Sequence, residues 1–160
     1  MEITKFASDL PYPTIEVKAN LAQSKLLMPS YSGSNGELNA ILTYCFQSYI
    51  SPKYPDLEHA LMGIAKTEMH HHHLLGEAIY RLGGYPIMGA RTYWNGNMVN
   101  YTLDPRKFLQ QNIAAEESAI MNYERTILNL DDECIKMMLE RIILDEEIHI
   151  KIFKELLKEF

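Results

Sequence analysis

Two Glu-x-x-His motifs are the clearest sign of chemistry in this sequence. Glu68 precedes His71 by three residues, and Glu146 precedes His149 by the same interval. Residues three apart lie one above the other on one face of an α-helix, so each motif places a carboxylate beside an imidazole. Fe and Mn both accept mixed oxygen and imidazole ligands. The motifs therefore indicate a metal site, provided that the fold brings them together.

Both motifs interrupt helical stripes that are otherwise apolar. The first stripe consists of Leu57, Leu61, Ile64, Glu68, His71, Leu75, Ala78 and Leu82, and the second of Ile135, Leu139, Ile142, Glu146, His149, Phe153, Leu156 and Phe160. The alternating spacing of four and three predicts that this face of each helix is buried. Because a buried carboxylate or imidazole is costly without a partner, something must compensate these four side chains.

An internal repeat adds two further glutamates and two tyrosines. The repeated segments are Glu37-x-x-Ala40-x-x-x-Tyr44 and Glu116-x-x-Ala119-x-x-x-Tyr123. Each segment is followed by a Glu-x-x-His motif, after 31 residues in the first case (68 − 37) and 30 in the second (146 − 116). We expect Tyr44 and Tyr123, two turns beyond the glutamates, to hydrogen-bond a carboxylate of the site.

Four helices are expected to position these residues in an all-α four-helix bundle over residues 34–160. Their approximate ranges are 34–49, 56–82, 104–129 and 131 to nearly the last residue. Gly83-Gly84 is a typical helix end, Asp104-Pro105 is a typical helix start, and Asp131-Asp132 are expected to cap the last helix. Residues 83–103 would then be a long crossover that makes the second and third helices parallel.

Residues 1–33 are expected to form an extended N-terminal arm. Pro11 and Pro13 lie in a stretch with little periodicity. Residues 20–28 could form a short helix within the arm, and Pro29 would stop it because proline removes a backbone donor.

The glutamates lie at matched distances from the expected turns. Each is 14 residues from the end of its helix hairpin, for example from Glu37 to Ser51, or roughly 21 Å at 1.5 Å per residue. We expect both hairpin turns at the same end of the bundle, which would bring six side chains to one level. These are Glu37, Glu68, His71, Glu116, Glu146 and His149.

Four buried carboxylates need either protons or cations to balance their charge. Two divalent ions would supply that balance, so the sequence predicts two Fe or two Mn ions per chain. A structural zinc site is not expected from four carboxylates without thiolates. Spacing alone leaves open which glutamates bridge the two ions. The alternative is a plain bundle whose Glu and His side chains face solvent. The remaining histidines near the first motif, His59, His70, His72 and His73, are expected at the surface or between subunits.

The composition narrows the possible partners. The 160 residues carry a net charge of −6, with a pI near 5.5, which argues against nucleic acid or an anionic membrane as a partner. No apolar run approaches the length of a membrane helix, and no secretory signal is recognisable. The two cysteines, Cys45 and Cys134, form no CxxC pair and suit a reducing compartment. A cytoplasmic location is therefore expected.

The order Glu, Glu-x-x-His, Glu, Glu-x-x-His resembles the ferritin-like di-metal carboxylate superfamily. Gly36-Glu37-Leu38 with Ala40 and Tyr44 resembles its manganese-catalase branch, and Glu68-Met69-His70-His71 with Leu74-Leu75-Gly76 fits that branch and the rubrerythrin-like proteins. The resemblance implies a ferritin-like bundle of up-down-down-up topology with two metals at its centre. It also implies the six ligands named above, with no catalytic residue beyond them.

The resulting hypothesis is a binuclear Fe or Mn oxidoreductase acting on hydrogen peroxide or dioxygen, with a role in oxidative stress. Two alternatives stay open: a protein that oxidises or handles iron, and a non-catalytic structural or coat protein stabilised by its metals. The broadly apolar helix at 34–49 favours a homo-oligomer, expected to be a dimer.

Overall fold

The computed structural model describes residues 5–160, and in that range the protein is an all-α bundle. Its α-helices are α1 (Leu21–Ser32), α2 (Glu37–Tyr49), α3 (Pro55–Arg81), α4 (Pro105–Asn129) and α5 (Glu133–Leu156), and two short 3₁₀ helices are η1 (Gly96–Met98) and η2 (Leu157–Glu159). The predicted fold class is confirmed. Among these described helices, none is long and apolar enough to cross a membrane.

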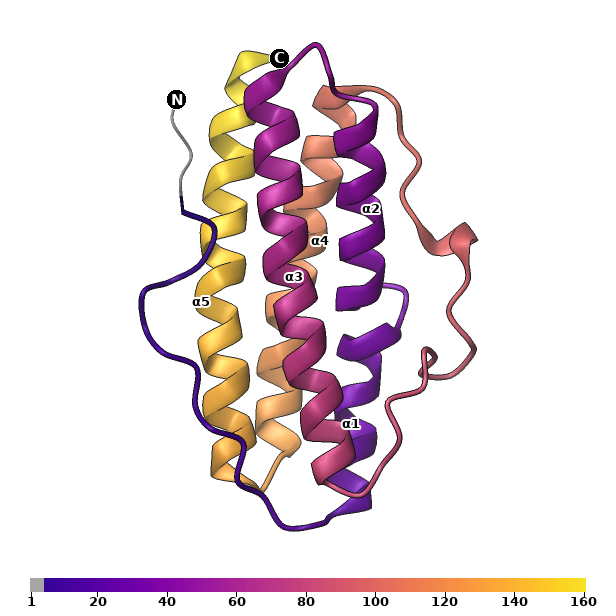
Figure 1. Ribbon diagram of the computed structural model, residues 1–160, viewed down its shortest axis with the longest axis vertical. Helices are drawn as coiled ribbons and strands as arrows, with labels where there is room; N and C mark the ends of the chain where they lie inside the picture. The colour runs from indigo at the N-terminus through magenta and orange to yellow at the C-terminus, as the bar shows by residue number, and fades with distance from the viewer. Residues whose placement is uncertain (1–4) are drawn as a thin grey trace.

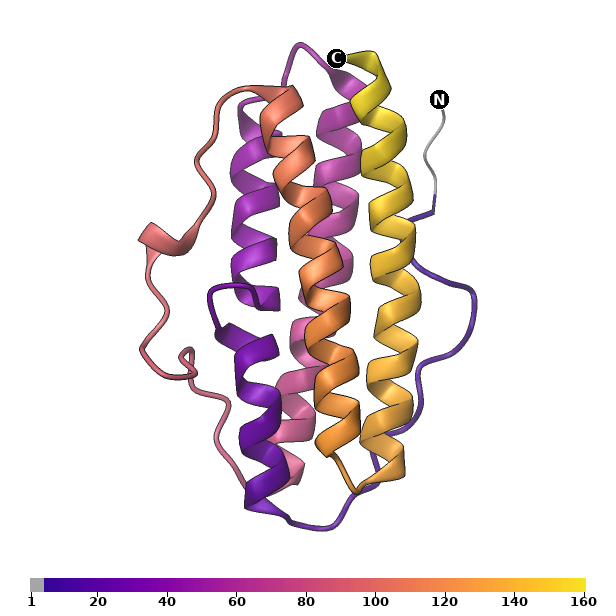
Figure 2. The same cartoon turned by 180° about the vertical axis from the view of Figure 1, so that it is seen from behind.

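The bundle has four helical columns side by side. The five α-helices make four columns because α1 and α2 stand end to end and share one (Figures 1 and 2). The helix α2 packs along α3, and α4 packs along α5. The columns run up, down, down and up in chain order (Figure 1). The apolar core consists of two clusters, one including Leu27, Leu75 and Leu139 and the other including Leu61, Phe108 and Phe153. The six Glu and His side chains of the predicted site belong to neither cluster, whereas Tyr123 belongs to the first and Tyr44 to the second.

The predicted position of the hairpin turns is wrong. The α2–α3 turn and the α4–α5 turn lie at opposite ends of the bundle (Figure 1). This follows from topology, since a crossover that makes α3 and α4 parallel carries the chain back along the whole length of the bundle. The glutamates still meet because 27 residues of α3 span about 40 Å, so positions about 21 Å from opposite ends coincide near mid-height.

Helix starts follow the predicted capping chemistry. The side chain of Asp104 accepts a hydrogen bond from the backbone N–H of Lys107, and that of Asp132 accepts one from Ile135. Each contact satisfies a donor that the first turn of a helix leaves without a partner. The N-cap aspartates thus fix where α4 and α5 begin.

The expected helix end at Pro29 is wrong, because α1 continues through Pro29 to Ser32. Proline loses one helical hydrogen bond, but Leu27 and Tyr31 on either side of it are buried in the core, which stabilises the helical path. The column breaks after it, at residues 33–36. A Cβ on Gly36 would lie 2.7 Å from the carbonyl oxygens of Pro29 and Ser30, so glycine permits this close approach. The domain division at residue 33 stays a prediction.

The predicted long connection between α3 and α4 runs along the outside of the α1–α2 column (Figure 2). Hydrogen bonds tie it down. Tyr31 donates to the carbonyl of Pro86 at 3.1 Å, Asn39 donates to that of Met98 at 2.9 Å, and the N–H of Asn100 donates to Thr43 at 3.2 Å. The connection is therefore a crossover that also covers α2.

Candidate metal centre

All six side chains predicted to form a site come together at mid-height of the bundle. Four helices supply them, and the set is Glu37 from α2, Glu68 and His71 from α3, Glu116 from α4, and Glu146 and His149 from α5. None is more than 5% exposed. The placement excludes the alternative in which these side chains face solvent. Their role as metal ligands stays a prediction.

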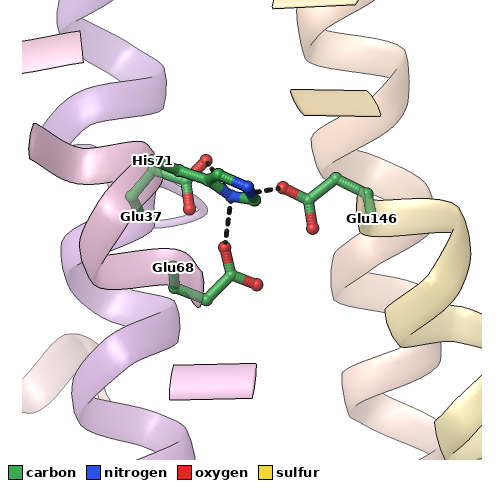
Figure 3. A group of neighbouring side chains, drawn as sticks. All are labelled: Glu37, Glu68, His71 and Glu146. Carbon is green, nitrogen blue, oxygen red and sulfur yellow. Dashed lines mark hydrogen bonds and ion pairs between the residues drawn. The ribbon is translucent and has the colours of Figure 1, made fainter. Parts of the chain in front are cut away.

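The six residues form two overlapping groups. One contains Glu37 and His71, the other contains Glu116 and His149, and both contain Glu68 and Glu146 (Figure 3 shows the first). Within each group the nearest ligand atoms lie within 4.8 Å of one another. Each group thus contains three glutamates and one histidine, as the repeated sequence leads one to expect.

The shared carboxylates each present one oxygen to each histidine. Glu68 Oε2 lies 3.0 Å from His71 Nδ1, and Glu68 Oε1 lies 3.0 Å from His149 Nδ1. Glu146 Oε1 lies 3.2 Å from His71 Nδ1, and its Oε2 lies 3.1 Å from His149 Nδ1. Glu37 and Glu116 each approach one histidine only, at 3.8 and 3.9 Å. The geometry therefore favours Glu68 and Glu146 as the carboxylates that two ions would share if they bound here, with Glu37 and Glu116 each near one of them.

The residues at this centre fit two cations. Glu68 Oε1 and Glu146 Oε1 are buried and make no well-formed hydrogen bond within the described chain, although each lies close to a histidine Nδ1, at 3.0 and 3.2 Å. Buried polar atoms without partners are rare in proteins, and a bound ion can satisfy them. Four carboxylates and two imidazoles without thiolate match the preferences of Fe and Mn better than those of a structural zinc.

The pKa values of the buried side chains show that positive charge stabilises the centre. Burial, together with the carboxylates of Glu68 and Glu146, raises the pKa of both Glu37 and Glu116 well above the usual value. Burial alone would lower the pKa of His149, but Glu68 and Glu146 outweigh it and raise that pKa to about 10. Hydrogen bonds to Asp145 and the glutamates likewise outweigh burial and raise the pKa of His71 well above its usual value. The metal-free centre therefore favours protons on the two outer carboxylates and on both histidines. Two divalent ions would replace them.

The two predicted tyrosines reach across the bundle. Tyr44 of α2 donates a hydrogen bond to Glu116 of α4, and Tyr123 of α4 donates one to Glu37 of α2. Burial and the nearby carboxylates raise the pKa of both phenols well above the usual value, so each remains a donor. These bonds orient the two outer carboxylates from the helices opposite.

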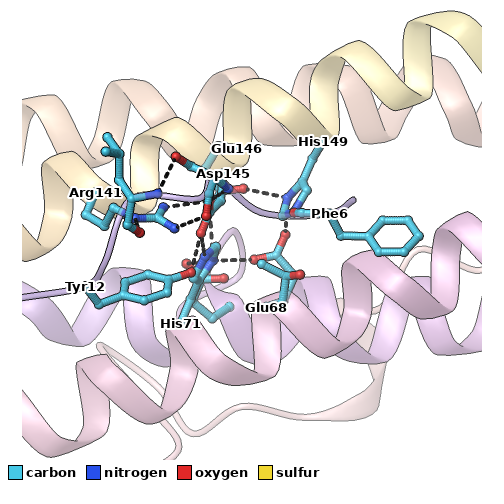
Figure 4. A network of polar contacts seen from close by, with 12 residues as sticks. Phe6, Tyr12, Glu68, His71, Arg141, Asp145, Glu146 and His149 are labelled. Carbon is cyan, nitrogen blue, oxygen red and sulfur yellow. Dashed lines mark hydrogen bonds and ion pairs between the residues drawn. The ribbon is translucent and has the colours of Figure 1, made fainter. Parts of the chain in front are cut away.

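Contacts behind the histidines were missed by sequence reasoning. His71 Nε2 lies 2.9 Å from Asp145 Oδ2, and His149 Nε2 lies 2.9 Å from the carbonyl oxygen of Phe6 (Figure 4). Asp145 also accepts from Arg141 Nη1 at 2.6 Å. The Arg141-x-x-x-Asp145 spacing could have indicated an ion pair on one helix face. Nothing in the sequence marks a backbone carbonyl.

A cavity of about 210 Å³ leads to the centre between α2 and α4. Glu37, Glu116 and Glu146 form part of its wall. The rest of the wall consists of Tyr44, Tyr123, Met98 and residues that are polar or small, which include Ser34, Asn39, Ala40, Thr43, Asn100, Gln111, Ala115 and Ala119. The break between α1 and α2 and the alanines of α4 leave this space open. A molecule of the size of peroxide or dioxygen can fit here beside the outer carboxylates.

The other histidines lie away from the centre, as expected. His59, His70 and His73 are exposed, while His72 is half-buried and stacks on Tyr31 with 4.1 Å between ring centroids. Cys45 and Cys134 are free thiols.

Comparisons with known proteins agree with this architecture. Residues 34–160 match the family model described as a ferritin-like domain. A probable manganese catalase of Clostridium acetobutylicum is 26% identical over an alignment of 165 positions. The alignment covers 89% of this chain and 73% of that protein.

Solved structures show the same arrangement. The crystal structure of KatB, a manganese catalase from Anabaena, superposes with a TM-score of 0.84 at 25% identity, over 98% of this chain and 80% of that one. The bacterioferritin of Desulfovibrio desulfuricans, described with a diiron site, superposes with a TM-score of 0.73 at 24% identity, over 86% and 79% of the two chains. The latter likeness shows the fold alone.

Proposed function

Because this chain belongs to the ferritin-like domain family, we propose that it is a binuclear Fe or Mn oxidoreductase that acts on hydrogen peroxide or dioxygen. One observation carries the proposal: Glu68 and Glu146 each present one oxygen to His71 and one to His149. Such a pair of carboxylates would hold two ions close together, and Glu37 and Glu116 would each bind one of these ions.

Two ions at this position would supply reversible one-electron chemistry to a bound oxidant. The chain's own residues do the rest. Tyr44 and Tyr123 hold the outer carboxylates through hydrogen bonds, and Asp145 holds His71 from behind. Apolar clusters on both sides of the centre exclude bulk water. The cavity at Glu37 and Glu116 is placed to admit a small oxidant.

Similarity to two manganese catalases supports peroxide as the substrate and Mn as the metal. The reaction would be 2 H₂O₂ → 2 H₂O + O₂. The second candidate is iron oxidation or handling, which the symmetric pair of outer carboxylates and the fold shared with a diiron bacterioferritin support. The cytoplasmic location and the homodimer stay predictions.

Oxygen measurements on metal-loaded protein separate these candidates. The Mn-loaded chain is expected to release dioxygen from hydrogen peroxide, and Glu147→Gln, an exposed neighbour of Glu146, should behave as the wild type does. Oxygen uptake with ferrous iron and no release from peroxide would favour iron oxidation. If the loaded protein did neither, the non-catalytic structural alternative would replace the proposal.

A further inference from the structure

An extended segment outside the bundle contacts the backs of both site histidines. Residues 5–12 have neither helix nor strand and run along α3 and α5 (Figures 1 and 4). The match to the ferritin-like domain begins at residue 34, so this segment lies outside it. We call residues 5–12 the strap.

The strap meets His149 directly. His149 Nε2 lies 2.9 Å from the carbonyl oxygen of Phe6, and a carbonyl can only accept a hydrogen bond. The proton of a neutral His149 is therefore held on Nε2. Its Nδ1 is then left with a lone pair directed at the oxygens of Glu68 and Glu146, where an ion would bind.

The strap meets His71 through Asp145. Asp145 Oδ2 accepts from His71 Nε2, and the same carboxylate accepts from the N–H of Ser8 at 2.7 Å and from the hydroxyl of Tyr12. Arg141, which also donates to Asp145, donates to the carbonyls of Ser8 at 2.8 Å and Leu10 at 2.7 Å. The carboxylate that holds His71 is thus itself held largely by the strap.

Two aromatic rings fix the strap on the bundle. The ring of Phe6 lies on α3 at Gly63, where any Cβ would overlap it. The ring of Tyr12 packs edge-on against His70, with 4.7 Å between centroids, and lies under the guanidinium of Arg141 at 4.1 Å. Such cation–π contacts add to the packing of the ring. The Phe6 ring belongs to the residue whose carbonyl contacts His149, and the Tyr12 ring carries the hydroxyl that donates to Asp145 behind His71.

We propose that the strap is a positioning element that holds both histidines with Nδ1 toward the centre, so that each half of the strap controls retention of one metal ion. Phe6 and Gly63 serve the ion beside His149, and Tyr12 serves the ion beside His71. This inference rests on the proposed binuclear centre.

The test measures Mn²⁺ binding to the full chain by the EPR signal of the free ion. Phe6→Ala is expected to lower the affinity for one of the two ions by 10- to 100-fold, which is the usual effect of losing a group that orients a metal ligand. Gly63→Leu should do the same by displacing the Phe6 ring, although leucine favours the helix more than glycine does. Phe6→Leu should restore affinity. Tyr12→Phe, which keeps the ring and removes the hydroxyl, should also lower the affinity for one ion.

Imidazole NMR of Zn²⁺-loaded protein then shows which histidine has changed. In Phe6→Ala and Gly63→Leu, the Nε2 proton of His149 should exchange faster with water while that of His71 does not, and Tyr12→Phe should show the reverse. Asp9→Ala is the matched control, since its side chain is 88% exposed within the same segment. It should bind two ions with unchanged affinity and leave both ring protons unaffected.

Two results would overturn the inference while the proposed function stands. Wild-type affinity for both ions in all three weakening variants would show that the strap does not position the histidines. Equal loss of both ions, together with a lowered melting temperature of the metal-free variant, would show that the strap stabilises the fold only. A wild-type chain that binds no ion would instead refute the proposed function, and the inference with it.

Discussion

Replacing Glu68 by glutamine removes one negative charge from a side chain that faces both halves of the centre. Its two oxygens each lie 3.0 Å from a histidine Nδ1, so the change is expected to lower the affinity for both ions. Loss of a group that only orients a ligand costs 10- to 100-fold in affinity, so we expect about 100-fold per ion for a bridging ligand. At saturating metal, each factor of 100 removes about 2.7 kcal/mol of stability.

The expected loss is therefore about 5 kcal/mol for the metal-loaded protein. In a domain of this size, 1 kcal/mol shifts the melting temperature by about 2–4 °C, so Glu68→Gln should lower it by about 10–20 °C. Glutamine has nearly the volume of glutamate, so packing is preserved and the metal-free protein should not lose comparable stability. Calorimetry with and without Mn²⁺ measures both quantities.

Two further variants make the prediction specific. Glu116→Gln touches only the group that contains His149, so it should cost about half as much as Glu68→Gln. Glu147→Gln is exposed and should have no effect on metal-dependent stability. If Glu68→Gln kept two ions and the wild-type melting temperature, the assignment of Glu68 as a bridging ligand would be refuted.

Three other predictions follow from the same geometry. His72→Ala should leave metal content unchanged and cost about 1 kcal/mol through the lost stacking on Tyr31; loss of metal by elemental analysis would mean that this histidine serves the centre. Ala115→Leu should narrow the cavity and lower kcat/KM for peroxide several-fold with unchanged metal content, and unaltered kinetics would exclude this route to the centre. The metal-free and loaded forms should respond to pH in opposite directions. The pKa of His149 is raised to about 10 from an unfolded value near 6.5, so its charged form stabilises the metal-free protein fully below about pH 6.5, and this stability is lost as pH rises toward 10. The loaded form needs deprotonated ligands, so it should lose ions and stability as pH falls. Melting curves from pH 5 to 10 test this, and a metal-free protein that gains stability toward pH 10 would contradict it.

The sequence predicted the parts of this fold that depend on local chemistry. The apolar stripes around Glu68 and Glu146 placed both residues on buried helix faces, and Asp104 and Asp132 marked helix starts through their capping side chains. These features depend on residues a few positions apart, where helical periodicity alone decides the geometry.

Other parts depend on tertiary structure and could not be predicted in this way. The helix α1 passes through Pro29 because Leu27 and Tyr31 are buried on the bundle, which overrides the local preference. The shared position of Glu68 and Glu146 between the two groups, on which their proposed bridging role rests, emerges only when α3 and α5 face each other. Phe6 contacts His149 through its backbone, which is the same for every residue type, so no sequence pattern could reveal the contact.

A binuclear centre is tested most directly by elemental analysis of the full-length protein, purified without chelator from medium that contains both iron and manganese. We predict close to two ions of Fe or Mn per chain in the wild type, and at most one in Glu68→Gln. A wild-type protein that contains no metal and takes up none on reconstitution would contradict the assignment of these six side chains as ligands.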